Sequence, residues 1–206
     1  MSCVIKNLTK IYPFESGENV IFDNFSLEFQ TDEITVFLGK SGCGKTTLLR
    51  LLADLEDIDA GEIDFFDEKG TKIYPKIGMV FQEPRLLPWR DVLGNVLIHQ
   101  EKQEESLGLK WLAQVGLADY AHTYPDELSG GMSARVAIAR ALSYEPELLL
   151  MDEPFAALDY FTRAELEKET IRLSREQNLG VVFITHDLDE ALLMAKKIVV
   201  LKKGEK

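Results

Sequence analysis

A glycine-rich string constrains this 206-residue chain more than any other feature: Gly39-Lys40-Ser41-Gly42-Cys43-Gly44-Lys45-Thr46. The string lies between an apolar run, Ile34 to Leu38, and a helical pattern of leucines that begins at Leu48. Glycines accept the backbone angles that aim several N–H groups at one anion, and no Cβ atom blocks the approach. We therefore predict a strand, a loop that cradles a nucleotide phosphate, and a helix. In that loop Lys45 would reach the β- and γ-phosphates, and the Thr46 hydroxyl would ligate Mg²⁺.

A glycine-rich turn without a ligand could give the same string, but a pair of acids further along favours the phosphate cradle. The apolar run Leu148 to Met151 ends at Asp152-Glu153, which Pro154 follows. Such a run is typical of a buried parallel strand, and ligands of α/β sheets bind at the carboxyl ends of these strands. Asp152 would hold the metal through its water shell, and Glu153 would polarise the attacking water. Phosphoryl transfer needs a metal, a phosphate cradle and an oriented water.

A third string, Leu128-Ser129-Gly130-Gly131, has the features of a helix start. Ser129 has the chemistry of an N-cap, and the residues from Ala134 to Leu142 supply an apolar helical face. The first N–H groups of such a helix and its dipole would form a second anion site. A plain capped helix is the alternative, although two glycines just inside a helix cost stability and indicate a close approach by another group.

The three strings, in this order, resemble those of the ATP-binding cassette (ABC) ATPases, and the resemblance extends over essentially the whole chain. It implies that Tyr12 stacks on adenine and that the phosphate loop, Gly39 to Thr47, binds the nucleotide. Gln82 matches the glutamine that links the metal to a partner protein, and His186 matches the switch histidine. Each match is weak alone, but the shared order and spacing exclude a chance origin.

The resemblance also implies how the ATP and Mg²⁺ sites are built. The implied catalytic residues are Gln82, Glu153 and His186, and the implied metal ligands are Thr46, Gln82 and Asp152. Ser129, Gly130 and Gly131 would contact the ATP of an opposite subunit, since one chain cannot easily direct two such loops at one γ-phosphate. Asp159, in Ala157-Leu158-Asp159, matches a loop of dimer contact. The implied active unit is a head-to-tail homodimer that holds two ATP molecules.

The sequence departs from the family pattern at two positions. Met132 stands where glutamine is common, and Ala156 stands where serine is often found. Methionine offers only a weak sulfur acceptor in place of an amide, which predicts a less efficient composite site. Glu153 and His186 are both present, so an active ATPase is still expected.

The apolar pattern predicts an α/β fold. Alternation at Phe25, Leu27 and Phe29 indicates antiparallel strands, as do the runs at Val4-Ile5 and Ile63–Phe66. Five short runs separated by helical stretches indicate a mostly parallel core sheet. These runs are Ile34–Leu38, Ile77–Phe81, Leu148–Met151, Val181–Thr185 and Ile198–Leu201. We expect one P-loop ABC-type ATPase domain over 1–206, with the core and an antiparallel β subdomain at about 1–85 and 141–206 and an inserted helical subdomain at about 86–140.

Composition narrows the class of protein further. With 46% hydrophobic and 28% charged residues, the chain can bury one substantial core. Residues 1–10 hold no apolar signal core, and no run is long enough to span a bilayer, which predicts a cytoplasmic location. The formal charge of −12 argues against sequence-independent binding of nucleic acid. Two cysteines are too few for a disulfide framework, so Cys43 should be a free thiol.

The string Phe81-Gln82-Glu83-Pro84-Arg85-Leu86-Leu87-Pro88-Trp89-Arg90 looks closest to the ATPases of importers for nitrate, sulfonate, taurine and thiamine-related pyrimidines. The resemblance implies integral membrane permease subunits and an extracytoplasmic solute-binding protein as partners. The chain would then lie on the inner face of the cell membrane. Trp89 and Leu86-Leu87 would line a groove for a permease helix, or the two leucines would be core of the helical lobe.

Two rival functions come from other classes. A nucleotide-gated binding module would form dimers without useful turnover, and steady-state phosphate release separates it from an ATPase. A soluble P-loop kinase or GTPase is disfavoured by the helix start at Ser129-Gly130-Gly131 and by the absence of an evident guanine-selecting Asn-Lys-x-Asp string.

Overall fold

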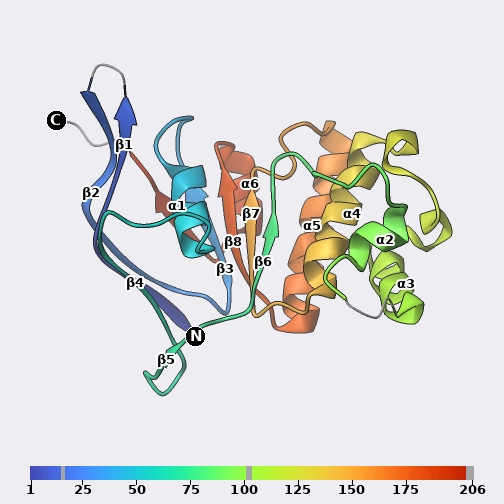
Figure 1. Ribbon diagram of the computed structural model, residues 1–206, viewed down its shortest axis with the longest axis horizontal. Helices are drawn as coiled ribbons and strands as arrows, with labels where there is room; N and C mark the ends of the chain where they lie inside the picture. The colour runs from blue at the N-terminus through green and yellow to red at the C-terminus, as the bar shows by residue number, and fades with distance from the viewer. Residues whose placement is uncertain (15–16, 101–103, 203–206) are drawn as a thin grey trace. The chain divides into compact units, whose positions relative to one another are not determined.

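The computed structural model describes residues 1–14, 17–100 and 104–202 (Figure 1). Its internal contacts divide the chain into two compact units. The first unit comprises Met1–Pro75 and Gly180–Lys206, and the second comprises Lys76–Leu179. The subdomain boundaries near residues 86 and 140 stay a prediction.

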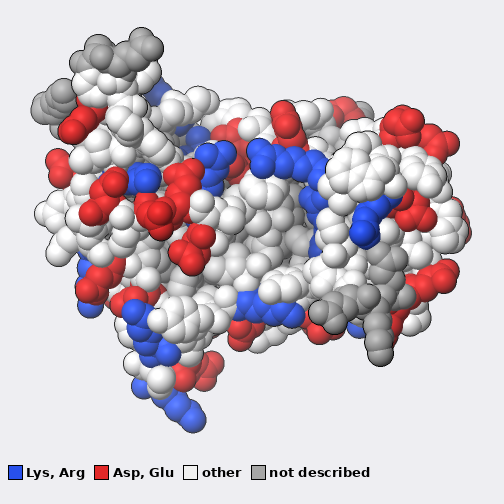
Figure 2. Space-filling model, in the orientation of Figure 1, with Lys and Arg blue, Asp and Glu red and all other residues white. Residues whose placement is uncertain are grey.

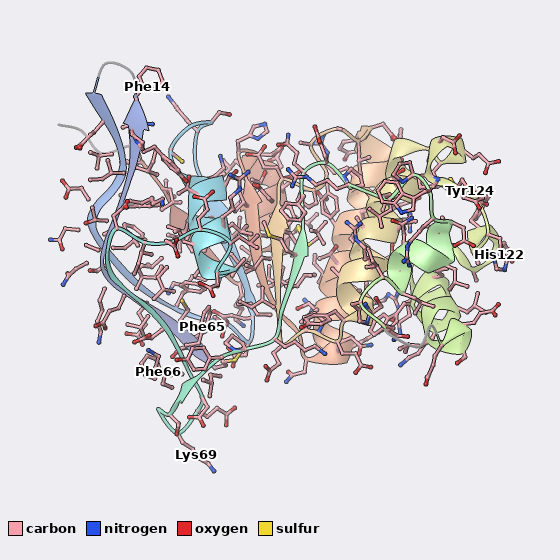
Figure 3. All side chains as sticks on the ribbon, in the orientation of Figure 1. Phe14, Phe65, Phe66, Lys69, His122 and Tyr124 are labelled. Atoms are coloured by element: carbon pink, nitrogen blue, oxygen red, sulfur yellow. The ribbon has the colours of Figure 1, made fainter. Side chains whose placement is uncertain are left out.

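An antiparallel sheet with strand order β2-β1-β4-β5 belongs to the first unit. Its strands are β1 (Ser2–Phe14), β2 (Gly17–Gln30), β4 (Ala60–Phe66) and β5 (Lys72–Ile73). Ile5 and Phe29 are buried whereas their neighbours Lys6 and Glu28 are exposed, so the alternating pattern gives the sheet one apolar face. Figure 3 shows Lys69 in the turn that follows β4.

The other elements in the described part of the first unit are three parallel strands and two helices. They are β3 (Ile34–Leu38), α1 (Lys45–Leu52), β8 (Gly180–Thr185), α6 (Leu188–Met194) and β9 (Lys197–Val200). Strand β3 pairs with β8 on one side and with β9 on the other. Phe29 of β2 and Phe37 of β3 meet edge to face with ring centroids 5.5 Å apart, so the two sheets of this unit share an apolar core.

The described residues of the second unit form two parallel strands, four α-helices and two short 3-10 helices. The elements are β6 (Ile77–Val80), α2 (Val92–Val96), α3 (Glu105–Gln114), η1 (Ala118–Tyr120), η2 (Pro125–Glu127), α4 (Gly130–Ser143), β7 (Leu148–Asp152) and α5 (Tyr160–Gln177). Helix α4 packs against both α2 and α3 (Figure 1). Its buried face includes Val136, Ala137 and Leu142, as its apolar pattern predicts.

The predicted core strands are confirmed, and their ends agree with the sequence prediction to within one residue. The antiparallel strands are confirmed as well. The described part of the segment between Gln82 and Ser129 is only partly helical, and Pro84, Pro88 and Pro125 all lie outside its α-helices.

The surface and the two cysteines add detail to the composition. Acidic and basic side chains are interspersed over the face shown in Figure 2. Within residues 1–14, 17–100 and 104–202, no helix combines the length and the apolar character that crossing a membrane requires. Cys3 and Cys43 are both free and buried, as expected for Cys43. Burial, with a smaller contribution from Asp64, raises the pKa of Cys3 to about 12.

Candidate functional site

The phosphate loop leaves β3 at Leu38 and ends in helix α1. Gly42 and Gly44 have φ angles of 78° and 100°, which residues with a side chain rarely adopt. Gly44 is the N-cap of α1, no side chain caps this helix, and its first turn holds no acidic residue. The positive end of the helix therefore points its backbone N–H groups into the loop, which suits an anion.

Lys45 folds back over the loop that precedes it. Its side chain is only 4% exposed, and its ammonium group donates to the carbonyl oxygens of Gly39 at 2.8 Å and Lys40 at 3.4 Å. Apart from its chain neighbours, no described residue has an atom within 4 Å of a Cβ atom added to Gly42, whereas one added to Gly44 would lie 2.7 Å from Ile21 Cγ2. Packing against Ile21 therefore requires a glycine at position 44. At Gly42 there is space for a ligand to approach the backbone.

His186 lies beside the phosphate loop. Leu38 and Thr185 are register partners at the ends of β3 and β8, so the residues that follow them come together. His186 lines a hollow of about 410 Å³ with Gly39, Lys40 and Ser41. The turn is fixed by Thr185, whose hydroxyl accepts from the Asp187 N–H at 2.9 Å and donates to buried Glu190. The structure thus brings the predicted switch histidine to the predicted phosphate site.

Tyr12 lies on β1 and is held by a polar cluster that the sequence did not reveal. Its hydroxyl donates to Glu56, which also accepts from Arg50 Nη1 at 3.1 Å. Partial burial, followed by the hydrogen bond to Glu56, raises the pKa of Tyr12, while a hydrogen bond with Thr47 acts in the opposite direction. The Lys10 ammonium lies 5.0 Å from the ring centroid. The aromatic ring is therefore fixed beside helix α1 by its hydroxyl end.

The acidic pair ends strand β7 in the second unit. All five residues of β7 are buried, and Asp152 is 7% exposed. Glu153 follows with a φ angle of 42°, and its carbonyl accepts from the Ala156 N–H at 3.2 Å. A left-handed conformation costs a non-glycine residue of order ~1–3 kcal/mol, and such strain clusters at functional sites. The chain thus turns sharply at the residue predicted to polarise water.

The helix start at Ser129 is confirmed. Ser129 Oγ accepts from the Met132 N–H at 3.2 Å. A Cβ atom on Gly131 would lie 2.6 Å from Thr162 Cγ2, so the close approach expected at this glycine is made by helix α5 of the same chain. At Gly130 the nearest atom is Leu158 Cδ2 at 3.8 Å. Gly130 is therefore the glycine with open space in front of it.

Gln82 and Asp159 also lie in the second unit. Gln82 is exposed and lines a hollow of about 420 Å³ with Gly130 and Pro154, which follows Glu153. Asp159 caps helix α5 by accepting from the Phe161 and Thr162 N–H groups, both at 3.1 Å. Hydrogen bonds from Thr162, first from its side chain and then from its backbone, lower the pKa of Asp159. The predicted dimer contact thus has a role within its own chain.

The comparisons with known proteins agree with this geometry. The family model for ABC transporters matches residues 22–156. The chain belongs to the ABC transporter family. The aliphatic sulfonates import ATP-binding protein SsuB 1 of Xanthomonas axonopodis pv. citri (strain 306) is 42% identical over 192 residues, which are 90% of this chain and 76% of that protein. Its counterpart in Bacillus thuringiensis subsp. konkukian (strain 97-27) is 38% identical over 210 residues, 100% of this chain and 84% of that protein.

A solved dimeric structure of an ATP-binding cassette, in a post-hydrolysis state bound to ADP and phosphate, resembles the fold closely. Its TM-score is 0.84 at 31% sequence identity, over 98% of this chain and 95% of that one. The resemblance, the fold class and the prediction of an importer ATPase are thereby confirmed at the level of the family.

The two units of this ABC cassette carry different parts of the predicted site. Tyr12, the phosphate loop and His186 belong to the first unit, and Gln82, Asp152, Glu153 and Ser129 belong to the second. The predicted metal ligands are a hydroxyl from Thr46, an amide from Gln82 and a carboxylate from Asp152. All three offer the oxygen atoms that Mg²⁺ prefers, so the chemistry of the donor set fits this ion.

Proposed function

We propose that this ABC cassette is the ATP-hydrolysing subunit of an importer for a small solute of the nitrate, sulfonate, taurine or thiamine-precursor type. The observation that carries the proposal is the phosphate loop, in which buried Lys45 bonds to loop carbonyls beside a hollow lined by His186. The two relatives named above are import ATP-binding proteins for aliphatic sulfonates, which favours sulfonates among these solutes.

The first unit would bind the nucleotide. The N–H groups of the phosphate loop and of the start of α1 would receive the phosphates, and Lys45 would turn from its carbonyl partners toward the β- and γ-phosphate oxygens. Tyr12 would offer its ring to adenine. Mg²⁺, when bound, neutralises charge that develops on the phosphate oxygens. His186 would help to hold the attacking water.

The second unit would supply the remaining groups. Glu153 would orient and polarise the attacking water, and Asp152 and Gln82 would hold the metal. Ser129, Gly130 and Gly131 would contact the ATP of a second copy, so that two copies close on two ATP molecules. The dimeric state of the solved cassette that contains ADP and phosphate supports this homodimer.

Permease subunits and a solute-binding protein outside the membrane would be the further partners. The segment from Gln82 to Trp89 is the proposed permease contact, because Trp89 is 71% exposed and follows closely on Gln82, the proposed metal ligand. Exposed tryptophan is a frequent anchor of protein interfaces. The protein would then be cytoplasmic and peripheral on the inner face of the membrane.

Steady-state phosphate release from the purified protein, alone and with its permease, tests the proposal. We expect Mg²⁺-dependent ATP hydrolysis that the permease stimulates, together with ATP-dependent dimers detected by light scattering of Glu153→Gln. A protein that forms these dimers but releases no phosphate in either state would be the rival binding module. Thermal stabilisation of the solute-binding protein by alkanesulfonates, nitrate or taurine would identify the solute.

A further inference from the structure

Arg140, near the end of the helix that Ser129 begins, holds the chain just beyond Gln82. Its Nη1 donates to the Arg85 carbonyl at 2.9 Å, and its Nη2 donates to the Pro84 carbonyl at 2.6 Å. These carbonyls belong to the peptide groups on either side of the Arg85 Cα atom. One planar guanidinium that bonds to both therefore fixes the backbone angles between them.

Residues 81–85, called the Gln82 turn below, are joined by a contact between the first and the last side chain. Arg85 has a φ angle of 47°, a conformation that a non-glycine residue keeps only when its surroundings hold it. Its guanidinium lies 4.5 Å from the centroid of the Phe81 ring, at the residue before Gln82. In the sequence, Gln82 thus lies between two residues that contact each other. Arg140, on helix α4, bonds to the backbone of the same turn.

Two further side chains attach the following segment to the helices. Buried Asn95, on α2, accepts from the Leu87 N–H at 2.7 Å and donates to the Leu87 carbonyl at 3.1 Å. Ser143, on α4, donates to the Val96 carbonyl at 2.7 Å, in the helix that carries Asn95. The segment 84–91 is therefore bonded to α2 and α4 by side chains, whereas its own strand, β6, ends at Val80.

We propose that Arg140 is a positioning residue that fastens the Gln82 turn to helix α4, so that Gln82 and the helix start at Ser129-Gly130-Gly131 move together. A helix transmits displacement along its axis because its backbone hydrogen bonds make it stiff. A force on the surface near Trp89 would then reach both groups at once. The consequence for ATP rests on the proposed function, whereas the fastening of the turn does not.

Hydrogen exchange on the complete chain measures the fastening directly. Arg140→Lys keeps the positive charge but replaces the planar guanidinium by a compact ammonium group. An ammonium group cannot bind both carbonyls in the geometry of the bidentate guanidinium. The reporting amides are those of Leu87, bonded to Asn95, and Arg90, which donates to the Leu87 carbonyl at 3.1 Å. We expect them to exchange about 10-fold faster in the variant, because the turn opens locally more often.

Arg135→Lys is the matched control. Arg135 lies on the same helix and donates to the Val115 carbonyl at 3.3 Å and to Glu169 at 2.6 Å, and neither partner belongs to the Gln82 turn. The control should leave exchange in segment 84–91 unchanged. Equal exchange in both lysine variants would overturn the proposal. Arg140→Met, which keeps an unbranched apolar side chain on α4 and removes both donors, should give the same or a larger effect even if Arg140→Lys folds poorly.

Catalysis separates a positioning role from a merely structural one. We expect Arg140→Lys to lower kcat about 5-fold with nearly the same KM for ATP, because Arg140 acts through Gln82. In a Gln82→Ala background the same change should lower kcat by less than about 2-fold, since coupled residues are not additive. An equal loss in both backgrounds would contradict this route. If the wild-type protein released no phosphate, the proposed function would fail, while hydrogen exchange would still decide what Arg140 holds.

Discussion

Gly131→Ala should destabilise the second unit, because the new methyl group has no room. A Cβ atom at Gly131 would lie 2.6 Å from Thr162 Cγ2. Thr162 cannot turn away cheaply, since its hydroxyl donates to Asp159 Oδ2 at 2.6 Å and its N–H donates to the same carboxylate at 3.1 Å. Relief therefore requires either the loss of a hydrogen bond or a shift of α4 away from α5.

The loss of stability expected for Gly131→Ala is the difference between two opposing effects. Overpacking a filled site costs ~1–3 kcal/mol, and replacing glycine by alanine inside a helix returns ~0.5–1 kcal/mol. A net loss of about 1–2 kcal/mol should lower the thermal midpoint by roughly 2–8 °C for a chain of this length. Gly130→Ala is the matched control, because its nearest neighbour is Leu158 Cδ2 at 3.8 Å and it should be as stable as the wild type or more so.

Thermal and urea unfolding, followed by circular dichroism, would compare the two alanine variants with Gly131→Ala/Thr162→Ser. Serine removes the methyl group that clashes and keeps the hydroxyl that bonds to Asp159. We expect this second change to restore most of the lost stability. The reasoning would be refuted by a Gly131→Ala protein as stable as Gly130→Ala, or by a serine variant that recovers nothing.

The other predictions concern the nucleotide and the partners. Glu153→Gln should keep ATP binding and lower kcat by ~100-fold or more, measured by phosphate release, because an amide cannot accept the proton of the attacking water. Lys45→Ala should weaken Mg-ATP binding in calorimetry by ~1.5–3 kcal/mol, whereas Ser129→Arg should leave monomer binding intact and block dimer formation; equal losses would contradict a contact across the dimer. Burial raises the pKa of Glu56, but hydrogen bonds outweigh it and the pKa lies below its ordinary value. Its stabilising effect is therefore fully present above its unfolded pKa of about 4.3 and is lost as the pH falls through the lower folded pKa, so the difference in unfolding midpoint between Glu56→Gln and the wild type should shrink progressively as the pH is lowered below that unfolded value. Trp89→Ala should weaken permease binding by ~2 kcal/mol and spare the hydrolysis of the isolated subunit, and an unchanged affinity for the permease would place the docking surface elsewhere.

The strands and the helix start could be predicted because their signals are local. Each core strand is a short apolar run, and β7 and β8 are buried over their whole length, so no alternation has to be interpreted. Ser129 was identified as an N-cap from its own chemistry and the apolar face that follows, and its bond to the Met132 N–H confirms it. The Gly39–Thr46 string likewise predicted its strand and its helix.

The contacts that hold the predicted residues in place were not predictable from local pattern. Arg140 and Pro84 are 56 positions apart, and Tyr12 and Glu56 are 44 apart. Arginine near a helix end and glutamate in a loop are ordinary surface residues in sequence, and only the fold makes them partners. The left-handed backbone at Arg85 and Glu153 is equally hidden, because neither residue is a type that prefers this conformation.

The reason for each glycine near the predicted anion sites could be assigned only from the structure. A glycine near an anion site can be present because a ligand comes close or because the protein's own atoms do, and the sequence is the same in both cases. Gly44 and Gly131 are explained by Ile21 and Thr162, with added Cβ atoms at 2.7 and 2.6 Å. Among the residues that the structure describes, Gly42 and Gly130 have no such neighbour within 3.4 Å. An alanine at Gly42 or Gly130 should therefore affect nucleotide binding more than packing, although at Gly42 the φ angle of 78° adds strain of order ~1 kcal/mol, so Gly130→Ala is the cleaner probe of the ligand.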